Sequence, residues 1–119
     1  DAELVAACEE LAARFAGSVE VSRSKPPFSV DASSPQVQAL IDIYNEQTGC
    51  DAKPFAMGGG TYARNFKSAV SFGPEDNDLE LPEWAGTMHG PNEAASEELL
   101  RDALKMYIKA ILRLQELDY

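Results

Sequence analysis

The chain is poor in the side chains from which zinc sites are built. Its 119 residues include one histidine and two cysteines. Zinc takes three or four protein ligands, most often from cysteine and histidine, so these residues alone are not expected to complete a zinc site. Cys8 and Cys50 belong to no C-x-x-C pair, and nothing in the sequence supports a disulfide between them. Two unpatterned cysteines fit a reducing compartment.

Positive charge and long apolar runs are also scarce. Ten Lys and Arg stand against 20 Asp and Glu, which gives a net charge of −10. This charge repels phosphate backbones and anionic lipid, so we expect no nucleic-acid partner and no membrane partner. No run approaches the roughly 20 apolar residues that span a bilayer. The chain opens on an acidic amphipathic segment, so we expect no signal peptide and a cytoplasmic location. It begins at Asp1 rather than Met, which indicates a trimmed or excised start, and removal of a tag would look the same.

Hydrophobic residues make up 45% of the chain, which is ordinary for a globular protein with a modest core. Apolar residues at helical spacing predict helices over 2–16, 35–48 and 97–117. Gly17 is expected to end the first helix. Ser34 and Gly49 are expected to cap the second, and Ser96 the third. The predicted buried faces comprise Val37, Leu40, Ile41 and Tyr44 on the second helix, and Leu100, Leu104, Tyr107, Ile111 and Leu114 on the third.

Short strands are predicted between the helices, over 18–24, 54–57 and 69–72. The order of helices and strands indicates an α/β fold. The rigid connector Lys25-Pro26-Pro27 marks a boundary between two structural units, 1–25 and 26–119. Few strands leave the helices' apolar faces poorly covered, which indicates that the chain packs against additional sequence.

A run of three glycines, Gly58 to Gly60, lies between a predicted strand and a predicted helical turn at 61–66. Glycine permits unusual φ values and lets a ligand approach the backbone closely. Backbone N–H groups, the Thr61 hydroxyl and the Arg64 guanidinium could together bind a carboxylate. A tight turn that binds nothing is the alternative. The run is not the dinucleotide fingerprint G-x-G-x-x-G, and it is not a Walker phosphate-binding loop because no Gly-Lys-Ser/Thr follows it.

The only histidine, His89, lies in the segment Met88-His89-Gly90-Pro91-Asn92-Glu93, just before the third helix. Imidazole is the commonest neutral metal ligand and the usual proton shuttle near pH 7. One histidine makes neither a metal site nor a catalytic triad, so a surface histidine is the competing interpretation. The acidic segment 75–80 lacks the EF-hand spacing and is interpreted as a solvated loop rather than a calcium site.

In combination, these motifs resemble the C-terminal end of the peptidase V-type dipeptidases. These bacterial enzymes belong to the aminoacylase and carnosinase group of two-zinc peptidases. The resemblance rests on residues 54–64, 69–74 and 89–93, which follow the family's order and spacing. It extends from about Pro27 to the end of the chain. Residues 1–24 resemble the end of the family's inserted lid domain less distinctly.

The resemblance implies a partial α/β catalytic domain over 26–119, with short strands packed by amphipathic helices, preceded at 1–25 by the end of the lid. It implies a parent with two zinc ions, a bridging aspartate and a glutamate base that lie outside these residues. His89 matches a ligand to one of the metals, and Glu93 matches a carboxylate that orients the loop or the ligand. The positions that match the substrate pocket are Gly59, Gly60, Thr61, Tyr62 and Arg64.

The function implied by the resemblance is metal-assisted hydrolysis of small peptides, with this chain inactive by itself. A different hypothesis is a stand-alone binding module that holds a small carboxylate in the glycine loop. A phosphate-binding loop of a transferase is disfavoured by the missing lysine. The partners expected are a small peptide substrate of the parent, the missing N-terminal part of the same chain and a second copy in a homodimer.

Overall fold

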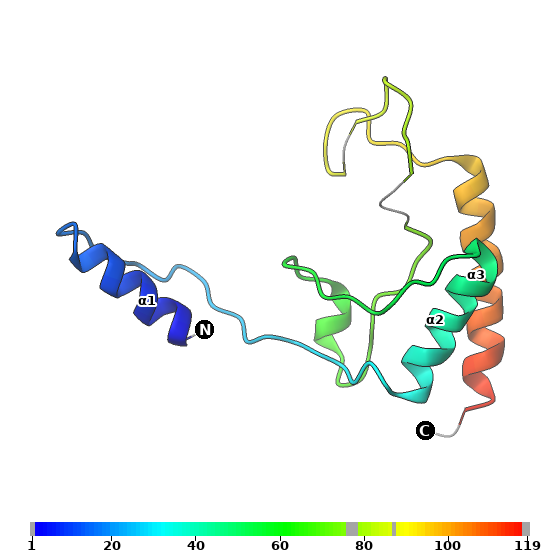
Figure 1. Ribbon diagram of the computed structural model, residues 1–119, viewed down its shortest axis with the longest axis horizontal. Helices are drawn as coiled ribbons and strands as arrows, with labels where there is room; N and C mark the ends of the chain where they lie inside the picture. Colours follow the sequence, from blue (N-terminus) through cyan, green and yellow to red (C-terminus); the bar gives the residue numbers. More distant parts are fainter. Residues whose placement is uncertain (1, 76–78, 87, 118–119) are drawn as a thin grey trace.

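The computed structural model describes residues 2–75, 79–86 and 88–117. Its elements are α1 (Ala2–Ala13), α2 (Pro35–Thr48), the 3-10 turn η1 (Tyr62–Asn65) and α3 (Glu97–Gln115). Figure 1 shows α2 and α3 side by side, with α1 apart from them at the end of a long connection. Among the described elements, α2 and α3 are the only pair that packs together. The fold is therefore a two-helix unit that carries long irregular loops.

Capping residues set the bounds of α2. The Ser34 hydroxyl accepts a hydrogen bond from the backbone N–H of Val37 at 3.4 Å, and Pro35 occupies the first turn. Gly49 takes the left-handed conformation, with φ 75°, and its N–H donates to the carbonyl of Asn45 at 2.8 Å. Both caps satisfy backbone groups that have no partner inside the helix. The predicted start and end of the second helix are confirmed.

The core is small and lies between α2 and α3. Of the side chains that the structure describes, Ile43 and Met106 are the two large ones that are almost fully buried, at 0% and 1% exposure. Neighbouring positions on the two helices complete the contact, and an edge-on contact between Phe72 and Tyr107 extends it, with ring centroids 6.1 Å apart. The residues packed in or against this cluster are Leu40, Ile43, Tyr44, Phe72, Met106, Ala110 and Leu114.

The predicted buried face of α3 is largely wrong. Leu100 and Leu104 are 58% and 60% exposed, and Tyr107 and Ile111 are exposed as well. The residues that face α2 are Ala103, Met106 and Ala110. Small alanines let the two helix backbones approach, so they occupy the contact and the large residues form a second apolar face. A helix that is apolar on both sides is typical of one buried between two layers.

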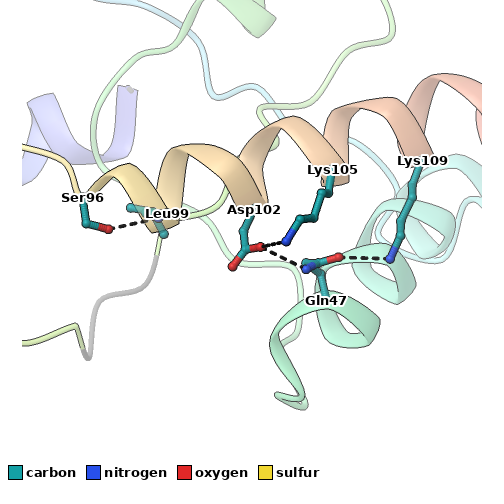
Figure 2. A network of polar contacts seen from close by, with 6 residues as sticks. All are labelled: Gln47, Ser96, Leu99, Asp102, Lys105 and Lys109. Atoms are coloured by element: carbon teal, nitrogen blue, oxygen red, sulfur yellow. Dashed lines mark hydrogen bonds and ion pairs between the residues drawn. The ribbon is translucent and has the colours of Figure 1, made fainter.

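A polar network joins the two helices beside the core (Figure 2). Gln47 of α2 donates to Asp102 Oδ1 of α3 at 3.1 Å, and Lys109 Nζ donates to Gln47 Oε1 at 3.1 Å. Lys105 pairs with Asp102 at 2.8 Å. At the start of α3, the Ser96 hydroxyl accepts from the N–H of Leu99 at 3.0 Å, which confirms this predicted cap. The network therefore links α2 and α3 through polar contacts in addition to their apolar core.

Acid is expected to weaken this network. The hydrogen bond from Lys105 holds the pKa of Asp102 below its ordinary value of 3.8. The Asp102 carboxylate thus binds a proton less readily in the folded chain than in the unfolded chain. Its contribution to stability is complete above the ordinary pKa of 3.8 and is lost as pH falls through the lowered pKa. Melting temperatures measured between neutral pH and about pH 3 should fall less steeply for Asp102→Asn than for the wild type. The control Asp42→Asn, on the exposed side of α2, should follow the wild type. Parallel curves for wild type and Asp102→Asn would contradict the prediction.

The predicted α/β fold is not confirmed, because the described residues contain helices and no strands. The segments 18–24, 54–57 and 69–72 form irregular backbone. A strand needs a neighbour to accept and donate its backbone hydrogen bonds, and no described segment pairs with these three in that way. The one β-type pairing among the described residues is an isolated parallel bridge between Gly86 and Glu93.

Helix α1 is shorter than the predicted 2–16 and buries none of its side chains. It ends at Ala13, and Ala16 rather than Gly17 adopts the left-handed backbone, with φ 54°. Gly17 closes the turn by donating its N–H to the carbonyl of Ala12 at 2.9 Å. The apolar side of α1 is exposed, at Leu4, Leu11 and Phe15. None of the described helices combines the length and apolarity needed to cross a membrane.

Candidate functional site

The predicted site residues lie on two loops, both in the segment that connects α2 to α3. The glycine loop, residues 58–64, runs from the glycine run into η1. The His89 loop consists of Gly86 and residues 88–93, shortly before α3. Figure 1 shows the two loops in separate parts of the molecule. The chain therefore brings together the predicted residues within each loop and does not bring one loop to the other.

His89 is exposed and has a left-handed backbone, with φ 61°. Its backbone N–H donates to Glu93 Oε2 at 3.0 Å. This hydrogen bond to a carboxylate is of the stronger, charge-assisted type. Glu93 thus contacts the backbone of the predicted metal ligand and leaves the imidazole exposed to an incoming group.

Gly86 and Asn92 close the His89 loop; the sequence motif contains Asn92 without giving it a role, and Gly86 lies outside it. The N–H of Gly86 donates to the carbonyl of Asn92 at 2.9 Å. Asn92 has φ 60°. A Cβ at position 86 would collide with the carbonyl oxygen of Pro91, so the close approach requires glycine. The signal in the sequence was the pairing of a glycine with an asparagine, the residue that best tolerates left-handed φ after glycine.

The glycine loop departs from one expectation. Gly58, Gly59 and Gly60 do not take left-handed φ values, so the unusual backbone predicted for the run is not observed. A Cβ at Gly58 or Gly59 would meet nothing within 4 Å. The first two glycines are therefore uncrowded, and no described part of the chain explains them.

The rest of the glycine loop contains the predicted polar groups. η1 confirms the predicted helical turn, with Thr61 at its N-terminal cap and no hydrogen bond from that side chain to the turn. Tyr62 is 88% exposed. Arg64 Nη2 donates to the carbonyl of Pro26 at 2.8 Å. A Cβ on Gly60 would lie 3.5 Å from Arg64 Nη1, so the guanidinium lies between the glycine run and the proline connector.

The described residues do not form a zinc site among themselves. No group of three or more His, Cys, Asp or Glu in the described part of the chain is arranged to hold a metal ion. Cys8 and Cys50 are free thiols on the surface. Of the acidic segment 75–80, residues 76–78 lie outside the described residues. His89 is exposed and belongs to no such group among the described residues.

Residues 2–113 match the model of peptidase family M20/M25/M40. The chain belongs to this family. The resemblance drawn from the motifs is thereby confirmed at the level of the family. The match also includes residues of α1, which the motifs supported less distinctly.

Relatives in two staphylococci carry dipeptidase names. The chain is 34% identical over 113 residues to "Putative dipeptidase SSP1012" of Staphylococcus saprophyticus, covering 89% of the chain and 23% of that protein. It is 38% identical over 96 residues to "Putative dipeptidase SAUSA300_1697" of Staphylococcus aureus, covering 81% of the chain and 19% of that protein. The chain thus spans about a fifth of the length of these relatives. No solved structure matches it.

Proposed function

We propose that this member of family M20/M25/M40 is the C-terminal part of a cytoplasmic, metal-dependent dipeptidase that hydrolyses small peptides. The dipeptidase names of the longer relatives support the substrate class. The observation that carries the proposal is the hydrogen bond between the backbone of His89 and the Glu93 carboxylate. It occurs within the motif whose histidine and glutamate match a metal ligand and its orienting carboxylate.

In this proposal His89 supplies one ligand to one of two zinc ions, and the rest of the parent supplies the others. Zinc, when bound, lowers the pKa of a water and polarises the scissile carbonyl. The imidazole fits this use because it is exposed and its backbone is held by Glu93. Glu93 acts through the loop, as carboxylates behind a metal ligand do.

The glycine loop lines the substrate pocket in the same proposal. Gly59 and Gly60 are small enough to let a peptide approach the backbone, and the Gly59 site is open in the structure. Thr61, Tyr62 and Arg64 add hydroxyl and guanidinium donors for the substrate's polar ends. The two loops are separate in this chain, so we propose that the remaining part of the parent brings substrate and metal between them.

We also propose that the division at residues 25–26 is a domain boundary. Residues 1–25 belong to the lid and 26–119 to the catalytic domain. The absence of packing between α1 and the other described elements supports this division. The exposed outer face of α3 supports the proposal that the missing N-terminal part of the same chain covers it.

The direct test is an activity comparison. The 119-residue chain, given zinc, cobalt or manganese, should show no turnover of dipeptides, because one imidazole cannot hold two metals. The full-length parent, purified and assayed alongside, should be active and should lose activity to a chelator. Turnover by the 119-residue chain that survives repurification and disappears with chelator would refute the fragment proposal. An inactive parent would refute the dipeptidase assignment.

A further inference from the structure

We propose that Gly86 and Asn92 are positioning residues for His89. They hold the loop backbone in one conformation, so that the imidazole is already oriented before a metal binds. This inference rests on the proposed function only in assuming that His89 is a metal ligand. The motif gives Asn92 no role and does not include Gly86, and neither residue is of a type that commonly binds zinc.

Contacts at both ends of the loop hold it closed. Gly86 and Glu93 form the isolated parallel bridge, and the Gly86 N–H donates to the carbonyl of Asn92 at 2.9 Å. Inside this closure, Glu93 Oε2 accepts from the N–H of His89 at 3.0 Å. The Glu93 N–H donates to the carbonyl of Gly90 at 3.4 Å. The backbone on both sides of His89 is therefore tied to the same short stretch, 90–93.

The closure explains two unfavourable backbone conformations. His89 and Asn92 both have left-handed φ values, of 61° and 60°. Non-glycine residues in this region persist where surrounding contacts impose the conformation, and they gather at functional sites. Histidine and asparagine are among the residues that tolerate it best. The one histidine in the chain is among the residues held in this conformation.

Glycine at position 86 is what permits the closure. A Cβ there would run into the Pro91 carbonyl oxygen and lie 3.0 Å from its carbon. Relief requires the backbone at 86 and at 91 to separate, which breaks the hydrogen bond to Asn92. The backbone of His89 would then no longer be held in one position, and neither would the imidazole that it carries. Removing the groups that orient a metal ligand typically weakens metal binding by about 10- to 100-fold.

Gly86→Ala tests the inference, with Gly58→Ala as the matched control because its Cβ would meet open space. In the 119-residue chain, His89 is the only histidine, so its NMR signals are unique. Gly86→Ala should shift the His89 amide signal and speed hydrogen exchange at the amides of 86 and 89 by about tenfold. Gly58→Ala should leave both unchanged. Unchanged His89 signals and exchange in Gly86→Ala would overturn the positioning role.

The full-length parent supplies the second readout. Gly86→Ala should weaken metal binding about tenfold, with kcat recovering at saturating zinc, because the ligand is present but displaced. Asn92→Gly should behave as wild type, since glycine keeps left-handed φ, whereas Asn92→Val should resemble Gly86→Ala. Equal behaviour of Asn92→Gly and Asn92→Val would overturn the inference. If His89→Asn leaves metal binding unchanged, the proposed function fails, while the NMR measurement still decides whether Gly86 positions His89.

Discussion

His89→Asn in the full-length parent is expected to lower kcat/KM more than about 100-fold, beyond the effect of removing a group behind the ligand. The imidazole is the only histidine side chain in this part of the protein, so no neighbour in these residues can replace it. Metal content per molecule should fall with activity, which mass spectrometry of the dialysed protein measures directly. Far-ultraviolet circular dichroism should stay unchanged, because the side chain is exposed.

Asparagine is the better replacement because of the backbone at this position. His89 has φ 61°, a backbone conformation that asparagine tolerates and that is strained for alanine. His89→Asn should thus remove the proposed ligand with little disturbance of the loop, whereas His89→Ala would combine loss of the imidazole with strain in the backbone. Glu83→Gln, an exposed change a few residues upstream, serves as the control. Near wild-type turnover of His89→Asn at saturating metal would show that the ligand role does not transfer to this residue.

Local signals predicted the helix bounds of α2 and the start of α3 well. Ser34, Gly49 and Ser96 act within one helical turn, so their effect does not depend on what the rest of the chain does. The prediction of the buried face of α3 was wrong because that face depends on a neighbouring helix and not on local sequence alone. Spacing identifies an apolar face, but it does not say which of two apolar faces meets a given neighbour. Ala103 and Ala110 pack against α2, because small residues let the two helices approach closely.

Strands were not predictable in the same way, because their backbone groups need a partner segment. Residues 54–57 and 69–72 have the composition of strands, yet no described part of the chain pairs with them. The candidate site shows the same difference between features set by a local motif and features set by contacts with other segments. The motif around 88–93 predicted that His89 and Glu93 act together, and a hydrogen bond joins them. Gly86 lies outside that motif, and its close approach to Pro91 depends on how the loop closes.

The two apolar faces of α3 bear on how the chain behaves when isolated. Met106 and its neighbours already use one face against α2. The other face is apolar and exposed, with its members one helical turn apart. They are Leu100, Leu104, Tyr107, Ile108, Ile111 and Leu112. Contiguous apolar patches of this kind mark sites that are covered by a partner.

We therefore expect the isolated 119-residue chain to self-associate through this face, or else to be only marginally stable. Burying a few hundred Å² of apolar surface is worth several kcal/mol, at about 25 cal/mol per Å². The net charge of −10 opposes the approach of two copies, so salt that screens this charge should strengthen the association. Sedimentation at two salt concentrations, combined with thermal melts across a range of protein concentrations, measures both effects.

Leu104→Glu combined with Ile108→Glu should abolish the association, raising the dissociation constant at least about 100-fold, because each change removes an apolar side chain worth roughly 1.5–3 kcal/mol when buried. Both positions are exposed in the monomer, so the α2–α3 core should be unaffected. Lys67→Glu is the control, since turning one positive charge negative shifts the net charge by the same two units as two new glutamates. If the control dissociates equally, charge rather than the α3 face governs assembly.

A wild-type monomer with a sharp, concentration-independent melt at high temperature would show that these residues form a complete domain. That result would favour the carboxylate-binding module over the dipeptidase fragment.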